Sequence, residues 1–138
     1  MHPGLENYIE KLEGAMAEGD VLLAARDPSR AERVRERCTD AVALVCAYQI
    51  FVHRELFEPL MRGGDESQRH TACELKAECI MLTDELRTGI KNFMAQEMPF
   101  DWDYLSSRVQ HFNMVVRSHI ARVRALMSTA AITLASTG

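Results

Sequence analysis

Apolar residues recur along this chain at alternating steps of three and four residues, the spacing that places them on one face of an α-helix. The stretch 72–86 shows this pattern most clearly, and its apolar face continues to Phe93. The positions on that face are Leu75, Cys79, Leu82, Leu86 and Phe93. A cysteine therefore lies on the apolar face, with the carboxylate of Glu78 beside it. Strand-like alternation is almost absent, so the pattern predicts an all-α protein.

Two helices are expected before this stretch. The first begins near Pro3, a residue suited to a first helical turn, and carries an apolar face at Leu5, Ile9, Leu12, Met16 and Leu23. The second begins at Ser29-Arg30-Ala31-Glu32, which has the form of a capping box. It runs to about Met61, and Pro59 is expected to kink or end it.

Two more helices complete the chain. The third begins around Asp65–Ser67 and runs into the nineties, where Met98-Pro99 stops it. Asp101 is a suitable N-cap for the fourth, whose apolar face is Leu105, Val109, Phe112, Val116, His119, Val123 and Leu126. The tail from Ser128 is expected to be weakly helical and to fray. Four long helices with short connections predict one domain, residues 1–138, folded as an antiparallel up-down-up-down four-helix bundle.

Composition narrows the class of protein. The chain has 138 residues, of which 47% are hydrophobic and 26% are charged, as is ordinary for a globular domain. A net charge of -4 gives no electrostatic reason to expect nucleic acid as a partner. No run of about 20 apolar residues predicts a membrane span. The N-terminus lacks a signal-peptide pattern and the four cysteines form no CxxC pair, so we expect reduced thiols in the cytoplasm.

Several expected core positions carry polar or ligating side chains. On the second helix these are Gln49 and His53, on a face with Val42, Cys46, Leu56 and Leu60. Residues equally far from a turn lie at about the same height in an antiparallel pair, at a rise of ~1.5 Å per residue. Counting from Gly64 and Pro99 places Gln49, Cys79 and His119 at one level and His53 one turn away. Asn7 or Tyr8 would come to the same level from the first helix.

Two levels of ligating side chains one turn apart resemble the geometry of a binuclear metal site in a helix bundle. No inward-facing carboxylate is evident for a di-iron site. We therefore take His53, Cys79 and His119 as candidate ligands of a mononuclear or atypical metal site, with Gln49, Glu58 and Glu78 as candidates for the surrounding shell. Thiolate and imidazole ligands favour a borderline-soft ion such as zinc or ferrous iron. Two alternatives are a core without any cofactor and a redox-sensing Cys79, its thiol pKa lowered by a nearby protonated imidazole.

Three passages resemble the hemerythrin-like (HHE cation-binding) domain family. In residues 52–60 a His and a Glu precede Leu-Phe and a proline; residues 78–86 have spaced leucines after Glu78-Cys79; residues 112–127 contain His119. The resemblance implies a four-helix bundle that binds two non-haem iron ions through histidines and bridging carboxylates. Carried over by position, His119 matches a histidine ligand, whereas Val123 replaces an acidic one.

The remaining positions of that resemblance depart from the ligand pattern. Leu75 and Cys79 stand where two histidines are expected. On the second helix, either His53 matches the histidine and Phe57 replaces the carboxylate, or Gln49 replaces the histidine and His53 the carboxylate. The resemblance therefore implies a hemerythrin-like domain in which most di-iron ligands are replaced.

Two classes of function follow. One is a regulatory or redox- or metal-responsive protein that is not an enzyme, because no acid completes a Cys-His catalytic arrangement. The alternative is a metal-free interaction protein on the same scaffold, which forms a homodimer or binds a protein partner. His70 and His111 lie off the apolar faces and are expected to be exposed.

Overall fold

The computed structural model describes residues 3–95 and 101–137, with side chains as far as residue 130. Its elements in chain order are α1 (Pro3–Ala25), a 3-10 turn (Pro28–Arg30), α2 (Ala31–Val52), a π-helical turn (His53–Phe57), α3 (Glu58–Gly63), α4 (Glu66–Ala95) and α5 (Trp102–Thr137). All of these elements are helical, as the sequence predicts. None of the described helices has the length and apolar character needed to cross a membrane.

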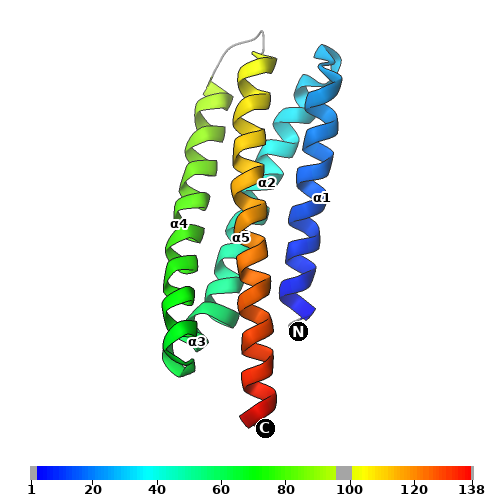
Figure 1. Ribbon diagram of the computed structural model, residues 1–138. Coiled ribbons are helices and arrows are strands. Elements are labelled where there is room, and N and C mark those ends of the chain that lie inside the picture. Colours follow the sequence, from blue (N-terminus) through cyan, green and yellow to red (C-terminus); the bar gives the residue numbers. More distant parts are fainter. Residues whose placement is uncertain (1–2, 96–100, 138) are drawn as a thin grey trace.

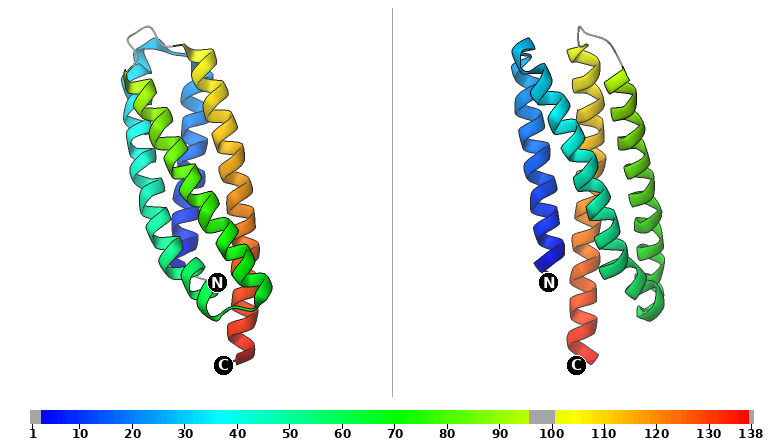
Figure 2. Two further views of the ribbon diagram at one scale, coloured as in Figure 1. Left: turned by 90° about the vertical axis from the view of Figure 1, so that its left-hand side faces the viewer. Right: turned by 180° about the vertical axis from the view of Figure 1, so that it is seen from behind.

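The four long helices lie side by side (Figure 1). α1 packs against α2 and α5, and α4 packs against the same two helices, so each long helix has two neighbours. Views from two further directions show the same arrangement, with the short α3 at the end of α2 (Figure 2). α5 is the longest element and extends past the start of α1 (Figure 1).

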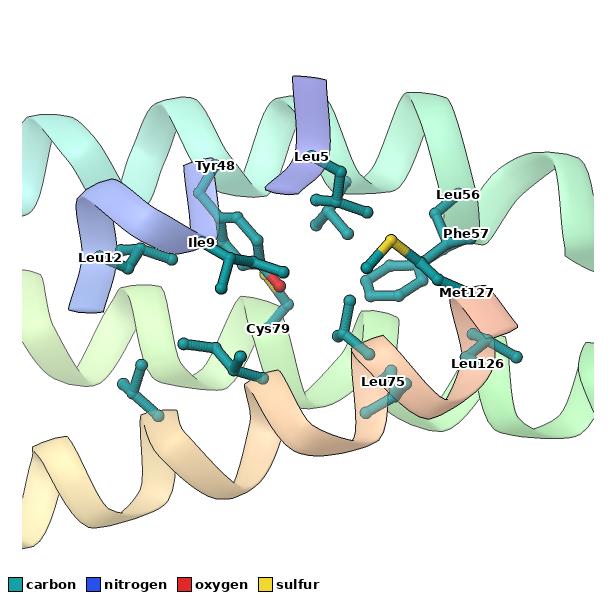
Figure 3. Packing of buried hydrophobic residues seen from close by; sticks show 14 of the residues in the cluster. Leu5, Ile9, Leu12, Tyr48, Leu56, Phe57, Leu75, Cys79, Leu126 and Met127 are labelled. Atoms are coloured by element: carbon teal, nitrogen blue, oxygen red, sulfur yellow. The ribbon is translucent and has the colours of Figure 1, made fainter. Parts of the chain in front are cut away.

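The main core lies in the half of the molecule where the chain begins. The predicted faces of α1, α4 and α5 are confirmed there: Leu5, Ile9, Leu75 and Val123 are fully buried. The predicted face of α2 is wrong by about one residue. Between residues 42 and 60 the buried side chains are Val45, Tyr48, Val52, Leu56 and Phe57, so Leu56 is the one member of the predicted face that is buried. The other members, Val42, Cys46, Gln49, His53 and Leu60, are half-buried. Figure 3 shows this packing at close range.

The helix starts differ in part from the predicted ones. Ser29 does not cap α2; instead Asp27 accepts from the backbone N–H and the hydroxyl of Ser29, and so caps the 3-10 turn. The reciprocal capping box lies at the start of α4. There the Asp65 carboxylate accepts from the Gln68 N–H at 2.8 Å, and the Gln68 amide oxygen accepts from the Asp65 N–H at 3.0 Å. Asp101 caps α5 as predicted, accepting from the N–H of Tyr104.

Pro59 does not end the helical path; it is the second residue of α3. The chain widens into the π turn His53–Phe57 immediately before it and continues helically to Gly63. In a regular α-helix a proline loses the i to i−4 hydrogen bond, and its ring clashes with the carbonyl of residue i−4. A preceding π turn changes this i to i−4 pattern and so accommodates the proline. The predicted stop at Met98-Pro99 lies outside the described residues. α5 continues to Thr137, so the tail from Ser128 is helical in the structure, and the expectation that it frays stays a prediction.

A candidate functional site at His119

His119 lies at the centre of a buried hydrogen-bond chain that joins three helices. Its side chain is 2% exposed. The ring nitrogen Nε2 lies 2.9 Å from the hydroxyl of Tyr48 on α2, and Nδ1 lies 2.7 Å from the carboxylate of Glu78 on α4. Both ring nitrogens are therefore engaged, one from each neighbouring helix.

The partners determine how the protons are placed in this chain. A carboxylate can only accept, so His119 donates from Nδ1–H to Glu78. The neutral ring then accepts at Nε2, and the Tyr48 hydroxyl is the donor. Burial lowers the pKa of His119 below its usual 6.5, and this effect exceeds the raising effect of the hydrogen bond that His119 donates to Glu78. Burial also raises the pKa of Tyr48 well above 10, with Cys79 and Glu78 adding to it, so the phenol keeps its proton.

Glu78 connects this chain to solvent. Its second carboxylate oxygen accepts from Arg122 at 3.3 Å, and Arg122 also pairs with Glu74 at 2.8 Å. Glu74 in turn lies 2.6 Å from the exposed His70. The sequence indicated no inward-facing carboxylate, and this is wrong for Glu78: its backbone lies beside the apolar face, but its long side chain reaches His119.

The relative heights predicted for α4 and α5 agree with the structure, but the neighbour of His119 predicted on α2 is wrong. Glu78, next to Cys79, contacts His119, as the counting from the turns predicts for α4 and α5. On α2 the contact comes from Tyr48, one residue before Gln49, and Gln49 is half-buried. On α1, Asn7 is exposed and Tyr8 packs its ring against Phe51 at 5.0 Å, so neither reaches His119 by the predicted route. Tyr48 is the residue that the sequence reasoning missed.

Cys79 is a buried thiol near Tyr48 (Figure 3). Its pKa is raised to about 12 by burial and by the neighbouring Glu78. This is the opposite direction to that expected for a thiol beside a protonated imidazole, because His119 is neutral. The backbone carbonyl of Cys79 accepts from the Thr83 hydroxyl at 2.9 Å, so this turn of α4 is held locally as well.

His53 lies on the π turn, apart from the hydrogen-bond chain. Its Nε2 is buried and has no hydrogen-bond partner among the described residues, and its ring lies 5.5 Å from that of Phe57. Burial is the largest cause that lowers its pKa, and Lys76 adds to it. Glu58, a candidate for the surrounding shell, pairs with Lys76 at 3.6 Å.

A di-iron centre does not fit the arrangement around His119. Iron ligands must offer free lone pairs, whereas the Nε2 lone pair of His119 accepts from Tyr48 and the Cys79 thiol keeps its proton. Across the part of the chain that the structure describes, no group of three or more His, Cys, Asp or Glu side chains could hold a metal ion. A site built from His53, Cys79 and His119 stays a prediction.

Comparisons with protein-family models, with curated proteins and with solved structures find no significant match.

Proposed function

We propose that this chain is a non-catalytic regulatory protein on a hemerythrin-like scaffold, in which the Tyr48–His119–Glu78 hydrogen-bond chain stands where that family holds its metal. The observation that carries the proposal is the engagement of both ring nitrogens of a fully buried histidine. A general acid or base must reach its substrate directly or through one water. With 2% of its side chain exposed, His119 acts on its two partners and links three helices.

The proposal includes the finer architecture, an antiparallel up-down-up-down bundle. Two observations support it: each long helix packs against two others, and the segments between successive helices are short. A histidine bonded to helices on either side then fixes their relative height, because a shift of one turn would leave two buried polar groups, those of Tyr48 and His119, without partners. We place such a protein in a reducing cytoplasm, where its four cysteines would stay free.

Metal analysis tests the proposal. Protein produced with added iron and zinc should contain neither in stoichiometric amount, and its melting temperature should not change when ferrous iron or zinc is added. His119→Ala should be destabilised with no change in metal content. His111→Ala, which alters an exposed histidine on the same helix, is the matched control and should behave as wild type. Stoichiometric metal that is lost in His119→Ala but kept in His111→Ala would overturn the proposal.

A metal-responsive protein is the second candidate function, and one observation favours it. The buried Nε2 of His53 has no partner among the described residues, and an unpaired imidazole nitrogen is a potential metal ligand. The same metal analysis on His53→Ala separates the two candidates. Zinc or iron bound by wild type and by His111→Ala, and lost in His53→Ala, would favour this second candidate.

A further inference from the structure

The outward side of α2 carries no charged residue over its middle turns. Neither Asp, Glu, Lys nor Arg occurs between Asp40 and Arg54, which are about 21 Å apart along a helix that rises 1.5 Å per residue. The side of this stretch that faces away from the core presents small or apolar side chains at Ala43, Cys46, Ala47 and Ile50. Ile50 is 66% exposed. A helix that is apolar on every side is normally buried, so this side of α2 has the character of a surface that a partner covers.

α4 continues this surface beside α2. The hydrogen bonds of His119 fix which turns of the two helices lie at one level, and Ile50 and Ile80 are each within one turn of that level. Ile80 lies one turn after Lys76, which pairs with Glu58 at the end of the α2 path, so it is on the side of α4 next to α2. It is 41% exposed. We call the surface formed by Ala43, Cys46, Ala47, Ile50 and Ile80 the α2 patch.

Opposite charges stand at the two ends of the α2 patch. The side chains of Asp40 and Arg54 are 60% and 65% exposed. Asp40 bonds to Arg37 through Oδ2, and Arg54 bonds to Glu55 through Nε and lies over the ring of Phe51. Among the described residues, Oδ1 of Asp40 and the terminal nitrogens of Arg54 make no hydrogen bond. Each end therefore has a charged group that can still bind an opposite charge from another molecule.

We propose that the α2 patch binds a second copy of this chain, with the two α2 helices running in opposite directions about a twofold axis near Ala47. The inference goes beyond the proposed regulatory function and does not depend on the hydrogen-bond chain at His119. Ala47 is midway between Asp40 and Arg54, so the Asp40 of each copy faces the Arg54 of the other. A parallel pair would place like charges against each other at both ends, which disfavours it.

The side chains of the patch fit the same arrangement. Ala43 and Ile50 lie four residues before and three residues after Ala47, so Ile50 of one copy packs near Ala43 of the other. The small side chains at Ala43 and Ala47 let two helices approach closely, since the distance between packed helices depends on the side chains at the contact. A twofold pair uses the same patch on both copies, and one patch therefore supplies the whole interface.

The charge pattern and the size of the patch favour a reversible homodimer. Opposite charges at equal distances from one residue are what a twofold pair requires, whereas a different protein partner sets no such condition on this chain. A standard interface has about 20–30 residues on each side, and the patch with its two end charges has fewer. We therefore expect a dimer that dissociates on dilution.

Sedimentation velocity at low ionic strength, from about 1 to 100 μM protein, tests the dimer. The mass should rise with concentration from 15.6 kDa toward twice that value. Ile50→Glu places a charge in the interface and should raise the dissociation constant at least about tenfold. Val21→Glu is the matched control, because Val21 on α1 is 65% exposed and lies outside the patch; it should dimerise as wild type does. Circular dichroism checks that both variants are folded. Wild type that stays monomeric at about 100 μM, or equal weakening by both variants, would overturn the proposal.

Exchanging the end charges tests the direction of pairing. Asp40→Arg and Arg54→Asp each bring like charges together in the proposed dimer, so each should raise the dissociation constant at least about fivefold. The combined variant restores the opposite pairs and should dimerise as wild type does. In a parallel pair each single variant would replace one repulsion by another and change little. Single variants that dimerise like wild type, or a combined variant that does not recover, would overturn the antiparallel pairing.

Discussion

Replacing Tyr48 with phenylalanine tests the buried hydrogen-bond chain with the smallest possible change. Tyr48 is 3% exposed, and its ring lies edge-on to His119 with 5.8 Å between centroids. Phenylalanine keeps that ring and removes only the hydroxyl, so packing is preserved. His119 Nε2 would then be a buried acceptor without a donor, at a cost of about 1–3 kcal/mol.

Urea unfolding followed by circular dichroism measures this cost. The midpoint should move to lower urea with an unchanged dependence of the unfolding free energy on urea, since no additional surface becomes exposed. Tyr104→Phe is the matched control, because Tyr104 is 56% exposed and its hydroxyl can bond to water. That control should change the free energy of unfolding by less than about 0.5 kcal/mol.

A double-mutant cycle identifies the partner. His119→Leu alone leaves the Tyr48 hydroxyl and the Glu78 carboxylate without their shared partner. Combined with Tyr48→Phe, it removes both members of one hydrogen bond, so the two losses should not add. The coupling free energy should be at least about 1 kcal/mol. A loss below about 0.5 kcal/mol in Tyr48→Phe, or strictly additive losses, would refute the proton placement that we describe.

The remaining predictions concern pH, thiol reactivity and a tight turn. Burial lowers the pKa of His119 from 6.5, so on acidification His119 is protonated at a higher pH in the unfolded chain than in the folded protein. The free energy of unfolding should therefore have its full value above about pH 6.5 and fall below that pH by up to about 1.4 kcal/mol per pH unit. Urea midpoints against pH should have a shallower slope in His119→Gln, and equal slopes would contradict this. A thiol reagent at neutral pH should label the exposed Cys73 first and Cys79, whose pKa is about 12, last; mass spectrometry of the peptides reports the order, and early labelling of Cys79 would contradict its burial. Gly64→Ala should lower the free energy of unfolding by about 1–3 kcal/mol, because its Cβ would lie 2.6 Å from the Leu60 carbonyl oxygen, whereas Gly63→Ala has open space and should cost nothing. Equal melting temperatures for these two alanine variants would be the contrary result.

Hydrophobic spacing predicted three of the four long helices well and one helix face badly. On α1, α4 and α5 polar residues separate the apolar ones, so one face stands out. In α2, residues 41–52 are apolar at almost every position, and the spacing fits two neighbouring faces equally well. In the structure the buried face is the one with Val45, Tyr48 and Val52. One observation could have favoured it: a tyrosine in an apolar run that supplies a hydroxyl for a buried histidine.

The level of the candidate site could be predicted because helical rise is fixed, but its composition could not. Counting from the turns placed His119 opposite Cys79, and the contact is made by the residue beside it, Glu78. The spacing of apolar residues predicts that a charged residue next to the apolar face points to solvent. A glutamate side chain is long enough to turn inward and accept from a buried donor. Here the donor is His119, which lies on a different helix. Such choices depend on side-chain reach between helices, which spacing within one helix does not contain.

The two ends of the bundle differ in how they are held. Around His119 the interior is filled by a continuous core with hydrogen bonds from three helices, so the helices have one relative height. Toward the other end the core reduces to the five-residue cluster beside Trp102, and a cavity of about 510 Å³ separates the helices. Dispersion contacts are lost wherever a wall has no partner atoms, so the second end is held by fewer packing contacts than the end around His119.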